Sequence, residues 1–209
     1  MYEGNIFFGD SITAGSNSNS RFSDYFYGGV VNKGVSGTTI GEYSIYPVDG
    51  NSLISKYNCS DIRFASNIFL EYGINDVSAI MCDFTDLNKV VLNFVKALDG
   101  IKQINKFAKI YWLSISDDVN IIFEHSKLQC KYLAEDYFKG YDFVFPATTF
   151  ADNYIQLLGY VRKRLPIIPM MNSKEFLTTY LSDDNIHPNE EGHKVIANNI
   201  KTSLGIDRA

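Results

Sequence analysis

The chain has few of the residues that mark several large classes of protein. Its cysteines are only three, Cys59, Cys82 and Cys130, an odd number without CxxC spacing. They fit neither a disulfide framework nor a zinc site, and we expect three reduced thiols. No apolar run reaches the roughly 20 residues that a membrane span needs, and the N-terminus lacks the basic segment and apolar core of a secretory signal. We therefore expect a cytoplasmic protein, with secretion as the alternative if this is a mature form.

Positive charge is also in short supply. Lys and Arg number 19 against 24 Asp and Glu, which gives a formal net charge of -5. A nucleic-acid partner would favour clustered Lys and Arg. The one basic cluster, Arg162-Lys163-Arg164, is more simply a solvated helix face or turn. We expect no nucleic-acid partner.

Apolar residues, by contrast, are abundant enough for a sizeable core. They make up 45% of the chain, and charged residues make up 21%. A length of 209 residues is common for one α/β domain. We therefore expect a single domain over 1–209, with no internal repeat, linker or disordered segment.

Short apolar runs alternate with helical patterns. We expect strands over 5–8, 28–32, 67–72, 109–115 and 141–145, and helices over 87–104, 123–138, 154–164 and 189–204. Continuous apolar runs of this length are typical of a buried parallel sheet. Alternating strands and helices imply βαβ crossovers and a three-layer α/β/α sandwich. Residues 38–66 are expected to be largely loop with one short helix, and 146–182 is long for a connection although it holds an extended piece over 165–169.

A serine stands where the first apolar run ends. Ser11 follows Gly9 and Asp10 directly after the first expected strand. Strand carboxyl ends face the binding crevice of an open α/β sheet, and the first N–H of the next helix has no partner within that helix. Ser11 is thus a candidate nucleophile whose own N–H can hold an oxyanion. The simpler interpretation is that Asp10 and Ser11 only cap a helix.

Histidine is scarce, and one histidine follows an acid. The three are His125, in an expected polar helix, His187 and His193. Asp184 precedes His187 by three residues, a spacing that lets the carboxylate reach one ring nitrogen while the other takes a proton from Ser11. Asp183 is a rival acid, and a plain surface turn is the simpler interpretation of the whole segment.

Two further residues are candidate oxyanion donors. Gly37 offers a backbone N–H with no side chain to hinder a substrate. Asn75 offers a neutral side-chain amide that keeps its donors at every working pH. A turn at Gly34 and Gly37, and a helix cap at Asn75, are the simpler interpretations. Taken together, the candidates supply the parts that acyl transfer through an activated serine needs.

Four ordered blocks give the chain a resemblance to a known family. They are Gly9-Asp10-Ser11, Asn32 to Gly37, Gly73-Ile74-Asn75-Asp76 and Asp184 to His187. In this order they resemble the blocks of the SGNH or GDSL hydrolases, with Ile12 where Leu is often written. The resemblance favours Gly37 over Gly34 and Asp184 over Asp183. It makes His193, in a Gly-His pair that often opens the last helix, structural.

The resemblance implies a fold and a reaction. The fold is a flavodoxin-like sandwich with about five parallel strands, and the reaction is ester hydrolysis with no metal or organic cofactor. Ser11 would be the nucleophile, His187 the base and Asp184 its orienting acid. The N–H groups of Ser11 and Gly37 and the Asn75 amide would form the oxyanion hole.

The substrate is less narrowly indicated. We expect a short acyl group such as acetyl on a carbohydrate or other polar molecule. Tyr43, Tyr46 and Tyr72 are candidates to stack on a sugar, although packing is the simpler role for most of the 14 tyrosines. A lysophospholipase or thioesterase is the alternative. It needs an apolar groove, for which Ile74, Ile155, Leu157 and Leu158 are candidates, although core packing is the simpler interpretation of these four. An O-acyltransferase and a non-catalytic binding module on the same scaffold are two more. Segment 146–182 is longer than in the smallest members and leaves the substrate pocket open.

Overall fold

The computed structural model describes residues 4–46, 50–140 and 144–206, without the side chains of residues 136 and 137. Its centre is a parallel sheet in the order β2-β1-β3-β4-β5. The strands are β1 (Gly4–Gly9), β2 (Gly29–Asn32), β3 (Ala65–Glu71), β4 (Lys109–Ser114) and β5 (Ile167–Pro169). This is the order of a flavodoxin-like sheet, as the resemblance implies.

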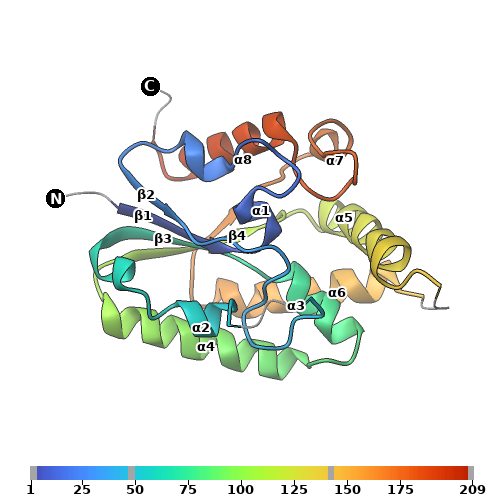
Figure 1. The fold of residues 1–209 in the computed structure, drawn as a ribbon, viewed down its shortest axis with the longest axis horizontal. Coiled ribbons are helices and arrows are strands. Elements are labelled where there is room, and N and C mark those ends of the chain that lie inside the picture. Colours follow the sequence, from blue (N-terminus) through green and yellow to red (C-terminus); the bar gives the residue numbers. More distant parts are fainter. Residues whose placement is uncertain (1–3, 47–49, 141–143, 207–209) are drawn as a thin grey trace.

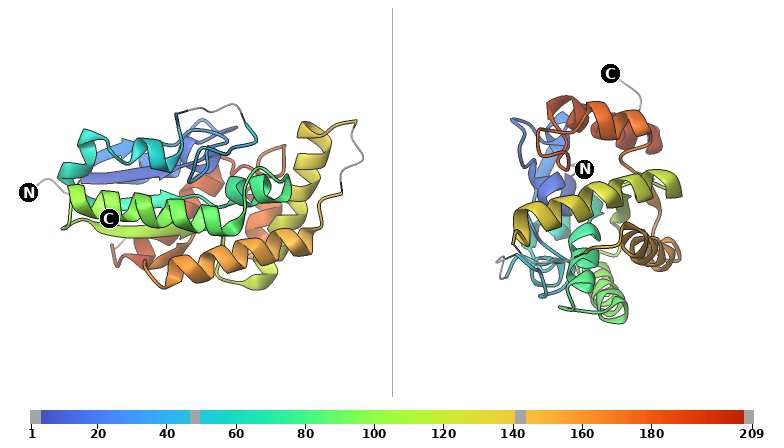
Figure 2. Two further views of the ribbon diagram at one scale, coloured as in Figure 1. Left: turned by 90° about the horizontal axis from the view of Figure 1, so that it is seen from below. Right: turned by 90° about the vertical axis from the view of Figure 1, so that its right-hand side faces the viewer.

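Helices cover both faces of the sheet. They are α1 (Ser11–Ala14), α2 (Leu53–Lys56), α3 (Ile74–Met81), α4 (Leu87–Ile104), α5 (Val119–Tyr132), α6 (Ala147–Arg162), α7 (Lys174–Thr179) and α8 (Glu190–Ser203). Figure 1 shows α7 and α8 on one side and α2, α3, α4 and α6 on the other, which confirms the three-layer sandwich. Figure 2 shows α5 lying across the end of the sheet. Short 3₁₀ turns at Phe22–Tyr25 and Ser60–Phe64 and a π turn at Leu133–Tyr137 complete the described elements.

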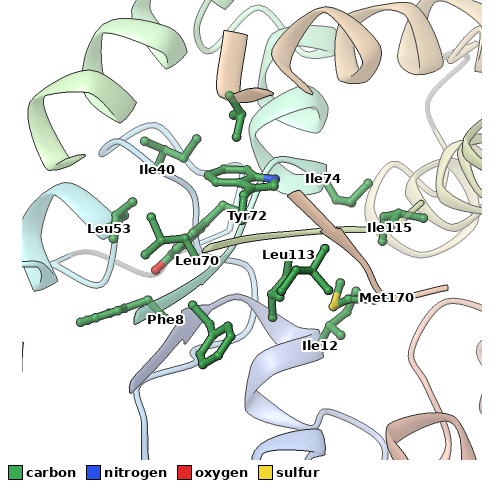
Figure 3. Packing of buried hydrophobic residues seen from close by; sticks show 14 of the residues in the cluster. Phe8, Ile12, Ile40, Leu53, Leu70, Tyr72, Ile74, Leu113, Ile115 and Met170 are labelled. Carbon is green, nitrogen blue, oxygen red and sulfur yellow. The ribbon is translucent and has the colours of Figure 1, made fainter. Parts of the chain in front are cut away.

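The central strands are apolar on both faces because both faces are covered. Phe7 of β1 stacks on Phe69 of β3 with ring centroids 4.6 Å apart. Their neighbours Phe8 and Leu70 point to the other face and are equally buried. Figure 3 shows Phe8 and Leu70 with Leu113 of β4 among the core side chains. The apolar side chains on both faces of the central strands are therefore buried under the helices.

Helix α4 has the bounds that its apolar stripe predicts. Val90, Phe94, Leu98 and Ile101 are buried along one face. The Asp86 side chain accepts a hydrogen bond from Lys89 N at 3.0 Å and so caps the first turn. Within the described residues, no helix combines the length and apolar character needed to cross a bilayer.

The fifth strand is not where the sequence predicts it. Residues 141–143 of the expected strand lie outside the described residues, and residues 144 and 145 belong to no strand. The fifth strand is β5, where Trp112 N donates to Pro166 O at 3.0 Å and Met170 N donates to Ser114 O at 2.8 Å. An edge strand tolerates proline because one side of it needs no donor. Because of these prolines, the sequence pattern predicts only an extended segment over 165–169 rather than a strand.

The long segment 146–182 is largely regular rather than loop. It holds α6, β5 and α7. Helix α6 begins at Ala147, seven residues before the expected start at 154, and α5 begins at Val119, before the expected start at 123. Residues 38–66 are mostly loop, with α2 and a 3₁₀ turn as their helical parts.

Candidate active site

A cavity of about 390 Å³ lies at the end of the sheet where the strands finish. Ser11, Gly37, Asn75 and His187 all line it. Ser11 follows β1 and Asn75 follows β3, the two central strands between which the strand order reverses. The crevice at such a switch point is the usual ligand site of open α/β sheets. Loops far apart in the sequence therefore bring the expected residues to one place.

Ser11 is the first residue of α1, where an N–H has no acceptor within the helix. Asp10 rather than Ser11 caps this helix, since its Oδ1 accepts from Ile12 N at 3.0 Å. The turn is tight: a Cβ on Gly9 would lie 2.1 Å from Thr13 Oγ1 and 2.8 Å from Glu71 O. Glycine is thus needed at this position, and the Ser11 side chain is left to line the cavity.

His187 and Asp184 form a close pair in the turn before α8. Asp184 Oδ2 lies 2.5 Å from His187 Nδ1. Asp184 Oδ1 accepts from the N–H groups of Ile186 and His187 at 3.0 Å, and from Ser182 Oγ at 2.9 Å. Burial opposes ionisation of Asp184, but these bonds from His187 and Ile186 outweigh it and hold the pKa of the carboxyl well below its usual range. An ionised Asp184 fixes the proton of His187 on Nδ1 and leaves Nε2 as the acceptor.

Asn17 is a third partner of this pair. Its Nδ2 donates to Asp184 Oδ2 at 2.6 Å and lies 3.5 Å from His187 Nδ1. No hydrogen bond joins Ser11 to His187 among the described residues, although both line the cavity. Such contacts are often long in unliganded enzymes and shorten when substrate binds.

Gly37 and Gly34 have different surroundings. Gly37 lines the cavity at φ +77°, and a Cβ there would lie 2.8 Å from the Tyr46 side chain. Gly34 packs instead against α1, where a Cβ would lie 2.4 Å from Ala14 N. The loop is fixed to the end of β1, because Val35 N donates to Gly9 O at 3.0 Å. Of the two glycines, Gly37 is the one beside Ser11 in the cavity.

The Asn75 amide is held by two acceptors. Its Nδ2 donates to Asp10 Oδ2 and to Thr38 O, each at 3.1 Å. An oxyanion in the cavity would compete with these two acceptors for the amide hydrogens. The next residue, Asp76, accepts from Ile40 N at 2.9 Å and so ties the Gly37 loop to α3.

Behind Asn75 lies a buried carboxyl pair. Glu71 Oε2 accepts from Asp10 N at 3.2 Å and from Thr13 Oγ1 at 3.0 Å. Burial, followed by the charge of the neighbouring Glu71, raises the pKa of Asp10 well above its usual value. Burial also raises the pKa of Glu71. Asp10, the residue before Ser11, joins this buried pair to Asn75 through its Oδ2.

The two rival residues lie elsewhere. Asp183 is exposed, and its backbone carbonyl accepts from Asn185 Nδ2 at 3.2 Å. His193 is buried in α8 against Phe22, with ring centroids 6.1 Å apart, and it is not among the residues that line the cavity. Within the described ranges, no group of three or more His, Cys, Asp or Glu side chains is arranged to hold a metal ion.

The sequence analysis did not identify every residue of the site. Among those it missed are Asn17, Glu71, His125 and Gln129. A charged residue that ends a buried apolar strand was a usable signal for Glu71, but Asn17 meets Asp184 across 167 residues of sequence and carries no local signal. His125 and Gln129 line the cavity, although the helix that carries them reads as polar.

Comparison with known proteins decides the family. A model of the GDSL-like Lipase/Acylhydrolase family matches residues 7–195, nearly the whole chain. The chain belongs to this family. A search of curated proteins found no match. Family membership supports a hydrolase activity.

Solved structures show the same fold for this GDSL-like protein. A lipase from a goat rumen metagenome has a TM-score of 0.62 at 12% identity, with 96% of each chain covered. A family two carbohydrate esterase from Clostridium thermocellum has a TM-score of 0.62 at 13% identity, covering 98% of this chain and 65% of that one. An acetyl xylan esterase from the rumen bacterium Butyrivibrio proteoclasticus has a TM-score of 0.60 at 15% identity, covering 99% and 66%. At these identities the likeness is one of fold.

Proposed function

We propose that this GDSL-like hydrolase is a serine esterase in which Ser11, His187 and Asp184 act as a triad. The observation that carries the proposal is the shared cavity of Ser11, Gly37, Asn75 and His187, with Asp184 2.5 Å from His187 Nδ1. A module that only binds its ligand needs no such combination of nucleophile, base and donors.

The reaction proceeds through an acyl-enzyme. Ser11 Oγ attacks the ester carbonyl as His187 Nε2 takes its proton, and Asp184 stabilises the imidazolium that forms. The N–H groups of Ser11 and Gly37 and one N–H of Asn75 hold the tetrahedral oxyanion. His187 then protonates the leaving alcohol. Water repeats the sequence and releases the acid and Ser11.

The preferred substrate is a short acyl ester, such as an acetyl ester, of a carbohydrate or other polar alcohol. Polar side chains line much of the cavity, among them Ser16, Asn17 and Ser36. Of the three tyrosines considered for stacking, Tyr46 lines the cavity, whereas Tyr43 and Tyr72 are buried in the core. Two of the similar folds are carbohydrate-acting esterases by description, which agrees with this choice.

A longer acyl chain is the second candidate, and the residues considered for its groove support it poorly. Ile74 lines the cavity. Leu157 and Leu158 are buried in the core, and Ile155 packs against that core. These three belong to α6, the helix that packs on α3 and α5. The only one of the four that remains available to a substrate in this cavity is Ile74.

A panel of nitrophenyl esters tests the proposal. We expect kcat/KM to be highest for acetate and to fall with butyrate, octanoate and palmitate. A maximum at octanoate or longer would favour the lipid-directed alternative, and transfer to an added alcohol in preference to water would favour an acyltransferase. Absence of turnover on every ester, with folded protein, would contradict the esterase proposal.

A further inference from the structure

Helix α5 turns a polar stripe towards the cavity. His125, Gln129 and Tyr132 lie four and then three residues apart, on one face of the helix, and all three line the cavity. His125 and Gln129 are only 1% and 2% exposed. The Tyr132 ring meets the His187 ring edge to face, with centroids 6.3 Å apart. The stripe therefore forms an inner wall beside the proposed base.

Two polar atoms of this wall are left without partners. His125 Nε2 and Gln129 Oε1 are buried and have no hydrogen-bond partner among the described residues. An unpaired buried polar group typically costs about 1–3 kcal/mol. Among the described residues, the other side chains with such atoms (Tyr72, Thr85, Trp112 and His193) do not line the cavity, whereas His125 and Gln129 do. The reaction proposed above uses neither residue.

His125 and Gln129 are uncharged at neutral pH, and each offers both a hydrogen-bond donor and an acceptor. Burial, and then the nearby His187, lower the pKa of His125 to about 4. At neutral pH its ring has one N–H donor and one nitrogen acceptor, and the Gln129 amide also has a donor and an acceptor. Rotation of the Gln129 amide about its last side-chain bond exchanges its oxygen and nitrogen, so this side chain can present an acceptor or a donor to a ligand.

This combination matches a hydroxyl group, which donates and accepts at once. A carboxylate or phosphate would need a cation, which this pair does not supply. An alkyl chain would leave both polar atoms unpaired.

We propose that His125 and Gln129 form a subsite that hydrogen-bonds hydroxyl groups of the leaving alcohol, and that esters of polyhydroxylated alcohols are therefore the preferred substrate class. The inference rests on the proposed function, because the subsite shares its cavity with Ser11 and His187. It adds specificity-determining residues that take no part in bond making or breaking.

A matched pair of acetate esters provides the test. Glycerol 1-acetate and propyl acetate have the same acyl group and the same three-carbon alcohol skeleton, and only the first carries free hydroxyls. We expect wild-type kcat/KM to favour glycerol 1-acetate by at least about tenfold, the effect of about one net hydrogen bond. Wild-type enzyme that hydrolyses both equally, or prefers propyl acetate, would overturn the subsite.

Variants show whether this preference arises at the wall. Gln129→Leu and His125→Phe remove the hydrogen-bonding groups, and each should lower the ratio of the two kcat/KM values about tenfold. Comparing this ratio between a variant and wild type cancels the difference in intrinsic reactivity between the two esters. Gln103→Leu makes the same chemical change at an exposed position of α4 and should leave the ratio unchanged. Gln129→Met, closer in shape, replaces Gln129→Leu if that variant does not fold.

The outcomes separate the two proposals. If folded wild-type protein hydrolyses neither acetate nor nitrophenyl acetate, the esterase proposal fails and the subsite fails with it. If both acetates are hydrolysed and the ratio is the same in wild type, Gln129→Met and His125→Phe, the esterase stands and the subsite is wrong. A ratio that falls in the wall variants and holds in Gln103→Leu supports the subsite.

Discussion

Replacing Asp184 with asparagine tests how the turn before α8 prepares His187. Asp184 Oδ1 accepts from Ile186 N, His187 N and Ser182 Oγ. Three donors at that oxygen oblige the new amide to keep its oxygen there. Its NH₂ group then replaces Oδ2, 2.5 Å from His187 Nδ1. His187 must accept at Nδ1 and carry its proton on Nε2, the wrong tautomer for a base acting on Ser11.

The expected effect is large and falls on kcat. A wrong tautomer at the base of a serine triad lowers kcat by about 10⁴ with little change of geometry. Asn17 adds to the effect, since its Nδ2 donor lies 2.6 Å from the oxygen that the amide nitrogen replaces. The assay is steady-state hydrolysis of nitrophenyl acetate, with circular dichroism to show that the variant is folded.

Asp183→Asn is the matched control. It makes the same change one residue away at an exposed side chain, and its activity should stay within about twofold of wild type because surface changes away from special features are mild. An Asp184→Asn variant that keeps more than a tenth of wild-type kcat would refute the reasoning. So would an Asp183→Asn variant whose kcat falls as far as that of Asp184→Asn.

Three further outcomes follow from the structure. Asn75→Ala should lower kcat by about 10²–10³ and move KM far less; the reverse pattern in steady-state kinetics would contradict an oxyanion role. Gly37→Ala, at φ +77° with Tyr46 2.8 Å from the new Cβ, should unfold at a lower urea concentration than Gly50→Ala, at φ +71° with no atom of the described residues within 4 Å of the new Cβ; equal midpoints would contradict the close approach. Burial lowers the pKa of His193 to about 4. As the pH falls from 6.5 to 4, this histidine therefore takes up a proton in the unfolded chain but not in the folded protein, and stability decreases. Urea titrations should show this loss reduced in His193→Phe, and an unchanged loss would contradict it.

Asp184 changes stability with pH in the same direction as His193, but in a lower pH window. Its pKa in the folded protein lies below the unfolded value, so its contribution is complete above about pH 4 and is lost only as the pH falls through the folded value. The carboxylate is therefore ionised throughout the range in which esterase activity is measured.

The parts of the fold that could be predicted from the sequence are those with uninterrupted apolar patterns. Strands β1, β3 and β4 are continuous apolar runs, and α4 carries an unbroken stripe. Strand β5 is short, flanked by Pro166 and ended by Pro169, and it is a strand because Trp112 and Ser114 of the neighbouring β4 offer partners. Only the tertiary structure supplies those partners, so local pattern could not identify it.

The residues of the candidate site likewise fall into those that local sequence identifies and those that depend on the tertiary structure. Ser11 and Asp184 belong to short local motifs, so they could be identified from the sequence alone. Asn17 and Glu71 act through partners far away in the chain, so their positions in the site depend on the fold. His125 lies in a helix whose buried face includes polar side chains, and this broke the apolar stripe that would have shown which face is inside.

Covalent labelling by a fluorophosphonate tests the central claim most directly. The probe reports a nucleophilic serine that is activated by a base, whatever the natural substrate. We expect one adduct, located on Ser11 by mass spectrometry of the digested protein. Labelling should be absent in Ser11→Ala and reduced at least a hundredfold in folded His187→Ala. An adduct on another residue, or undiminished labelling of Ser11 in His187→Ala, would contradict the proposed triad.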